Sequence, residues 1–177
     1  MRGWLPLAAL TTLAACTHER TLSLATHASM PLQRSSTRKV AIVLEDRLVS
    51  PRYETSTDGH NFVLYGAPRA IAQALESALA GRVALVHSVR APAPTGFDAY
   101  VFPALSLEAS GLVKHHCTAR LAVEVRDAAG QTVGRGHGEA DEVFYIMFSG
   151  TEACETALAA ALGDAATQAL PGIDALP

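Results

Sequence analysis

The sequence predicts an α/β (α+β) two-layer sandwich, a mixed sheet of about five strands with two helices on one face, in the order β-α-β-β-β-β-α. Three observations favour this class. The segment Lys39–Leu44 is almost continuously apolar, which is typical of a buried central strand. A helical pattern and a second strand follow it, as in a crossover between parallel strands. Three more strands and an alanine-rich helix then complete the chain.

The first helix and the strands around it follow from periodicity and turn residues. Residues 50–66 are polar and contain Asp58-Gly59, which predicts a long loop or a short hairpin. Pro68 suits the first turn of a helix, and Gly81 ends it. Three apolar residues share one face of this helix: Ile71, Leu75 and Leu79. Residues 83–89 then form the second strand.

The second half of the chain predicts three more strands and a long helix. Residues 100–108 form a strand in which Pro103 favours an edge position or a bulge. Residues 115–126 and 132–144 form the next two strands. The last strand places small residues on one face, namely Gly134, Gly136, Gly138 and Ala140. A stripe without side chains permits close approach of a helix, and the helix over residues 151–170 is the candidate to cover it.

The first residues resemble the signal of a bacterial lipoprotein. The positive charge of Arg2 precedes an apolar run that is too short to span a bilayer. Leu13-Ala14-Ala15-Cys16 then matches the lipobox, in which the Cys thiol receives a diacylglyceryl group and the chain is cut before it. The alternative is a secretory signal whose cleavage site happens to hold a cysteine. Thr17, in place of an aspartate, points to the outer membrane.

The lipobox sets the expected domain organisation. Residues 1–15 are the signal peptide, and residues 16–38 hold the lipidated Cys16 and a flexible tether rich in Ser and Thr. Residues 39–172 form a single globular domain, and residues 173–177 form a tail. No later segment holds about 18 consecutive apolar residues, so we expect the lipid to be the membrane anchor of a domain that faces the periplasm.

The two remaining cysteines predict a disulfide, because exported proteins fold in an oxidising compartment. Cys117 shares one face of its strand with Leu121, and Cys154 shares the apolar stripe of the last helix with Leu158. If that helix covers the strand, both thiols point into the same core. A bridge over about 37 residues stabilises the fold by roughly 3–4 kcal/mol on the chain-entropy model. The alternative is two free core cysteines that never meet.

Composition excludes two classes of protein. The chain has 177 residues, of which 49% are hydrophobic and 18% charged, so it carries enough apolar material for one core and is not a disordered chain. Its formal net charge is −3, which argues against a nucleic-acid binder held by a basic surface.

Polar clusters offer alternatives to a simple binding role. His115 and Cys117 share one face of their strand, and Cys154 lies opposite them if the last helix covers that strand. These ligand types suit zinc or copper, although a disulfide removes the thiolates. The residue types of a hydrolase triad are present near one another in the sequence, as Ser149, His137 and Asp141. The sequence lacks the Gly-x-Ser-x-Gly motif of many hydrolases. We therefore expect no catalytic residue, no metal and no cofactor.

Aromatic residues, only 6% of the chain, concentrate in two segments. The run 143–148 belongs to the core if it is buried, and forms a partner or membrane contact if it is exposed. Segment 50–66 is the second candidate, because loops of this length are often functional. The candidate partner surface consists of six residues: Tyr53, Phe62, Tyr65, Phe144, Tyr145 and Phe148.

Over residues 39–170 the chain resembles the YajG-like group of small outer-membrane lipoproteins and, more loosely, the lipoprotein domains of the CsgG and LpoB type. The likeness rests on Cys16, Lys39–Val43, Ala74–Leu79, Leu121–Asp127 with Gly130, and Ala157–Leu162. The resemblance implies a non-catalytic envelope accessory and transfers no functional residue apart from Cys16. We expect it to bind an envelope protein. The alternatives are a carrier of a small ligand or metal, and a hydrolase.

Overall fold

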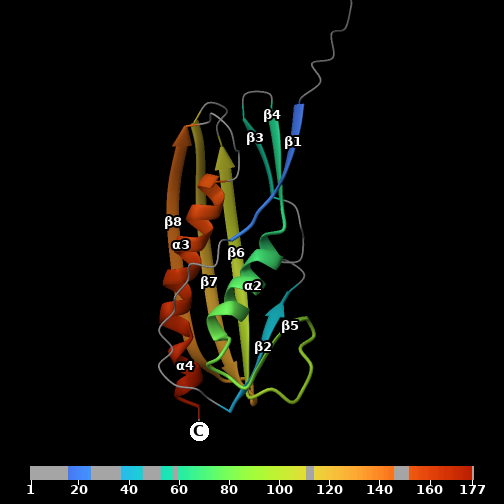
Figure 1. Ribbon diagram of the computed structural model, residues 1–177, viewed down its shortest axis with the longest axis vertical. Coiled ribbons are helices and arrows are strands. Elements are labelled where there is room, and N and C mark those ends of the chain that lie inside the picture. The colour runs from blue at the N-terminus through green and yellow to red at the C-terminus, as the bar shows by residue number, and fades with distance from the viewer. Residues whose placement is uncertain are drawn as a thin grey trace, which may run out of the picture.

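The structure is a computed structural model that describes residues 16–24, 37–45, 53–57, 60–110, 114–145 and 152–176 (Figure 1). The strands are β1 (Cys16–Thr21), β2 (Lys39–Leu44), β3 (Tyr53–Thr57), β4 (His60–Tyr65), β5 (Leu85–Arg90), β6 (Ala99–Ser110), β7 (Lys114–Asp127) and β8 (Thr132–Tyr145). The helices are α2 (Ala67–Leu79), α3 (Glu152–Ala169) and the short α4 (Pro171–Asp174).

The main sheet has five strands in the order β5-β2-β6-β7-β8. Strand β2 pairs in parallel with both β5 and β6, whereas β6, β7 and β8 pair antiparallel, so the sheet is mixed. Helices α2 and α3 lie side by side on the same face of this sheet (Figure 1). The predicted fold class is therefore confirmed. A second sheet of order β1-β4-β3 stands beside it.

Strand β2 is the centre of the parallel part. Its side chains from Val40 to Val43 are all at most 1% exposed, on both faces of the sheet. Burial on both faces explains why this strand is apolar throughout instead of alternating. The expected crossover from β2 through α2 to β5 is present, with β5 parallel to β2.

Helix α3 packs directly against the glycines of β8. A Cβ atom added at Gly138, Gly136 or Gly134 would lie only 1.7–2.1 Å from a helix carbonyl oxygen. These oxygens belong to every fourth residue of the helix, at Ala161, Ala165 and Ala169. Two strand residues rise about 6.7 Å and four helix residues about 6 Å. Every second residue of β8 therefore meets every fourth residue of α3. The predicted close approach of helix and strand is confirmed.

Side chains from the two helices cover the two edges of the main sheet. On β5, the Ser88 N–H and hydroxyl donate to the Glu76 carboxylate of α2 at 3.0 and 2.6 Å. On β8, the His137 N–H donates to the Gln168 side chain of α3 at 3.2 Å, and the Gln168 amide donates to the His137 carbonyl at 3.0 Å. Both contacts satisfy edge groups that would otherwise be open to another strand.

The segments outside the main sheet differ from expectation. Within residues 50–66 the structure has the hairpin β3–β4, one of the two predicted forms. Residues 16–21 form strand β1, paired with β4, instead of the start of a flexible tether. The physical reason lies just after β1, where the Leu22 side chain is only 3% exposed because it packs in the core. Residues 25–36 of the expected tether lie outside the described residues.

The expected tail after residue 172 is packed as well. Ile173 and Leu176 are buried, and the Arg38 guanidinium donates to both of their carbonyl oxygens. Pro103 takes one of its two predicted settings, because it lies at a local edge of β6, and the β6–β7 ladder has no bulge at this residue. Pro103 is accommodated there because the ladder between β2 and β6 ends at Val101, so the missing N–H lies beyond the parallel pair.

Candidate functional site

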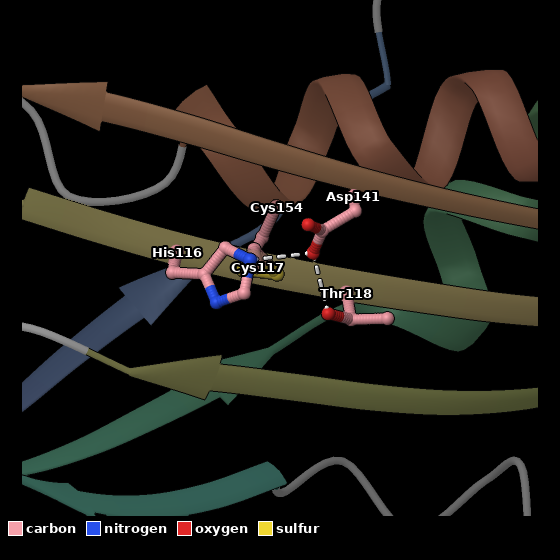
Figure 2. Close-up of a disulfide and its surroundings, with 5 residues drawn as sticks. All are labelled: His116, Cys117, Thr118, Asp141 and Cys154. Carbon is pink, nitrogen blue, oxygen red and sulfur yellow. Dashed lines mark hydrogen bonds and ion pairs between the residues drawn. A yellow bond between two sulfur atoms is a disulfide. The ribbon is translucent and has the colours of Figure 1, made fainter.

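The disulfide Cys117–Cys154 joins strand β7 to the first turn of helix α3 (Figure 2). Its Cα atoms are 5.0 Å apart, and both residues are buried, at 1% and 3% exposure. Cys117 faces the helix because it lies two residues before Ala119 and four before Leu121, which are buried on the same face. The bridge is therefore the predicted one.

A second group lies on the opposite, outer face of the sheet beside the disulfide (Figure 2). The register of β7 and β8 places Thr118 directly opposite Asp141. The Thr118 hydroxyl donates to Asp141 Oδ1 at 2.6 Å, and His116 Nε2 lies 2.6 Å from the same oxygen. The hydrogen bond from Thr118, and next that from His116, holds the pKa of the Asp141 carboxyl below its usual range.

The order of these three groups does not suit nucleophilic catalysis. In a hydrolytic triad the imidazole stands between carboxylate and hydroxyl, so that it can take the hydroxyl proton. Here Asp141 stands between His116 and Thr118, and a single oxygen faces both. His116 and Asp141 are also about half exposed, so water competes for every one of these contacts.

The residues considered for a hydrolase triad do not lie together in the structure. His137 and Asp141 lie four residues apart on β8, which is about 13 Å along a strand. Asp141 instead contacts His116, and Ser149 lies outside the described residues.

The weak metal candidates do not form a site in the part of the chain that is described. Cys117 and Cys154 are bonded to each other, which removes both thiolates, and the side chain of His115 lies outside the description. Among the described residues, no group of three or more His, Cys, Asp or Glu side chains could hold a metal ion.

The other end of the outer face carries a charged network around Glu124. Arg126 donates two hydrogen bonds of 3.1 Å to the two oxygens of this carboxylate, and the Thr132 hydroxyl donates a third. Arg135 lies 3.6 Å away. The Arg126 bond first, and then the Thr132 bond, lower the pKa of Glu124 to about 2. The Arg126 guanidinium also stacks over the Phe102 ring, 4.5 Å from its centroid.

Two hollows lie at the surface. One, of about 580 Å³, is on the outer face, where Ala104 and Ala122 are small and leave space between Phe102, Arg126 and His137. The other, of about 440 Å³, lies between helix α2 and the ends of β2 and β5. Its lining includes the apolar side chains of Leu44, Pro68 and Ala72, the cations Arg69 and Arg90, and the Glu76 carboxylate, which accepts from Ser88.

The elements that hold the aromatic candidates for a partner surface reach the same end of the molecule. The hairpin β3–β4, which holds Tyr53, Phe62 and Tyr65, and the end of β8, which holds Phe144 and Tyr145, are at the same end (Figure 1). Phe148 lies outside the described residues, as do the side chains of the other candidates except Tyr65. Tyr65 is partly buried, and Val143, which precedes Phe144 in β8, is 39% exposed.

The predicted lipidation residue, Cys16, is the first residue of β1. Its side chain lies outside the description. Among the described helices, none is long and apolar enough to cross a membrane.

The sequence reasoning missed the His116–Thr118–Asp141 group and the network around Glu124. Alternation along β7 does place His116, Thr118 and Glu124 on the face opposite Cys117. Their partners on β8 depend on the register, which the periodicity of one strand cannot supply.

Comparison with known proteins identifies no family. No protein-family model matches the chain, and no curated protein matches it. A protein of Caulobacter crescentus, described provisionally as a lipoprotein, is 14% identical, with 61% of this chain and 79% of that chain aligned at a TM-score of 0.39. The hypothetical protein CT253 of Chlamydia trachomatis is 11% identical, with 62% and 73% aligned at 0.38. At these values the likeness says nothing about function.

Proposed function

We propose that the chain is a non-enzymatic lipoprotein of the bacterial envelope, held at the outer membrane by a lipid on Cys16 and acting as an accessory factor that binds an envelope protein. The distribution of the three cysteines carries the proposal. Cys117 and Cys154 share a buried disulfide, which forms in an oxidising compartment such as the periplasm. The remaining cysteine is the one that ends the lipobox.

Lipidation is tested by growing cells with an alkyne-tagged fatty acid and separating inner from outer membranes. We expect label on the wild-type protein in the outer-membrane fraction and no label on Cys16→Ser. Cys154→Ser is the matched control, because it removes a cysteine that is bridged in the fold and should keep the label. An unlabelled wild-type protein, or a labelled Cys16→Ser variant, would disprove the lipid anchor.

The accessory role is supported by the chemistry of the exposed sheet face. Charged side chains on this face form pairs, as Glu124 does with Arg126 and Glu139 with Arg120. No polar or charged side chain is fully buried within the described residues. A catalytic acid or base is usually tuned by burial and charge together, so this face suits recognition better than chemistry.

The partner surface is proposed at the aromatic end of the molecule. A photo-crosslinking residue placed at Tyr65 or at Val143 in living cells should join the same envelope protein from both sites. The same residue at Ala128, an exposed position in the β7–β8 turn, should not. Equal products from all three positions would mean that neighbours are captured in proportion to their abundance, and the proposed surface would be wrong.

A second candidate function, a carrier of a small ligand, is favoured by the hollow beneath α2. It combines an apolar lining with Arg69 and Arg90, neither of which forms an ion pair with another described residue. Such a site would take an anion with an apolar body. Native mass spectrometry of protein released gently from membranes should show bound mass if this function is correct. Mass equal to that of the lipidated chain alone would count against it.

A further inference from the structure

The chain that follows Cys16 is bound to the domain from its first residue. Strand β1 pairs in parallel with β4 along its whole length, from Cys16 opposite His60 to Thr21 opposite Tyr65. The Leu22 N–H extends the contact by donating to the Tyr65 carbonyl at 2.8 Å. These are backbone contacts, which do not depend on the exact side chains of β1.

Three further contacts hold the next residues independently of that ladder. The Leu22 side chain is only 3% exposed and packs in the main core, so apolar burial holds it there. The Ser23 N–H donates to the Glu155 carboxylate of α3 at 2.9 Å. Gly66 allows the close approach, since a Cβ there would lie 3.1 Å from the Thr21 methyl group.

We infer that the lipid anchor is joined directly to the folded domain, and that the end of the molecule formed by the start of β1 and the β3–β4 hairpin rests on the bilayer surface. This inference depends on the proposed lipidation of Cys16. The 23 residues first expected as a tether would span about 25–30 Å as a flexible chain and would let the domain turn freely. Because β1 is paired with β4, the chain next to the lipid is instead a fixed strand of six residues, at most about 20 Å long.

The direction of the strands fixes which part meets the lipid. Because β1 and β4 are parallel, Cys16 and His60 lie at the same end of the small sheet. Strand β3 is antiparallel to β4 and ends there as well, with Thr57 opposite His60. This end lies away from the C-terminus (Figure 1). A lipid on Cys16 therefore brings Thr57 and His60 to the level of the headgroups.

A single tryptophan can report this contact, because the only tryptophan of the chain is Trp4, which is lost with the signal. Lipidated His60→Trp protein is placed in vesicles of phosphatidylethanolamine and phosphatidylglycerol whose acyl chains are brominated near the headgroup. We expect its fluorescence to be quenched and blue-shifted. Lipidated Ala128→Trp is the control at the opposite end of the molecule, and it should be neither quenched nor shifted.

The outcomes separate this inference from the proposed function. Flotation of the protein with the vesicles tests the lipid anchor by itself, and a protein that does not float contradicts the proposed function. A protein that floats but shows equal quenching at positions 60 and 128, or none at either, overturns the inference alone. If His60→Trp fails to form the Cys117–Cys154 bridge and is misfolded, Thr57→Trp gives the same test from the neighbouring strand. Leu22→Ala should reduce the quenching at position 60 while flotation persists.

Discussion

Replacing Gly136 by alanine is expected to displace helix α3 from strand β8. The added Cβ would lie 1.7 Å from the Ala165 carbonyl oxygen, where ordinary contacts begin near 3.4 Å. Helix and strand would have to separate locally by roughly 1.5 Å, and no rotamer change can relieve a clash with backbone. The Cys117–Cys154 bridge resists the movement at the start of the helix. Overpacking costs about 1–3 kcal/mol, and a clash with backbone this close belongs at the upper end of that range. Alanine regains at most about 1 kcal/mol in a strand, so we expect a net loss of about 2 kcal/mol.

Urea unfolding of a soluble Cys16→Ser form, followed by circular dichroism, measures this loss. With a slope of about 2 kcal/mol per molar urea, the midpoint should fall by about 1 M. Gly163→Ala is the matched control, since Gly163 lies in the same helix with nothing within 4 Å of its added Cβ. That change should raise stability by about 1 kcal/mol through helix propensity. If Gly136→Ala unfolds at the wild-type midpoint while Gly163→Ala behaves as expected, the close packing of the α3 backbone against β8 is refuted.

Three further expectations concern the disulfide, a charged pair and a sheet edge. Reducing the Cys117–Cys154 bridge should lower the unfolding free energy by about 4 kcal/mol for its separation of 37 residues, and an unchanged urea midpoint with reductant would contradict this. The folded pKa of Glu124 is lowered to about 2 from 4.5, so its stabilisation is complete above about pH 5 and is lost as the pH falls toward 2. At neutral pH the wild type should be more stable than Glu124→Gln by about 1 kcal/mol, and this difference should vanish near pH 2. A difference that grows on acidification would refute the stabilisation by ionised Glu124. Gln168→Ala exposes the edge of β8 and should increase self-association in light scattering, whereas Thr167→Ala loses only a bond within its own helix and should not.

The elements of the main sheet were predictable because their patterns are local and strong. Strand β2 has the predicted bounds Lys39–Leu44, and the helix predicted over residues 151–170 is Glu152–Ala169. Strand parity and the helical stripe each place one cysteine on its buried face, so the predicted disulfide followed from two independent periodicities.

Strand β1 was not predictable in the same way. Its residues are polar and have no sustained periodicity, so composition favours a tether. Order there comes from tertiary contacts, namely the free edge of β4 and the core position of Leu22. Both depend on parts of the fold that lie more than 35 residues away along the chain, such as β4 at His60–Tyr65.

A one-residue register shift between Val125 and Arg126 decides what the last strand presents to each face. A regular hairpin continued from the pair of Arg126 and Thr132 would oppose Val125 to Val133, and the glycines of β8 would then face outward. The shift opposes Val125 to Gly134 instead, so the glycine stripe shares the buried face with the valines of β7.

The same shift determines which side chains of β7 and β8 meet on the outer face of the sheet. It sets Arg135 opposite Glu124 and Asp141 opposite Thr118, whereas a regular hairpin would set Ala140 opposite Thr118 and leave its hydroxyl without a carboxylate. The close approach of α3 to β8, the position of Arg135 beside Glu124 and the His116–Thr118–Asp141 group therefore have one physical origin. Parity within β8 alone can group the glycines on one face, but only the irregularity in the ladder determines that this face is the one beneath the helix.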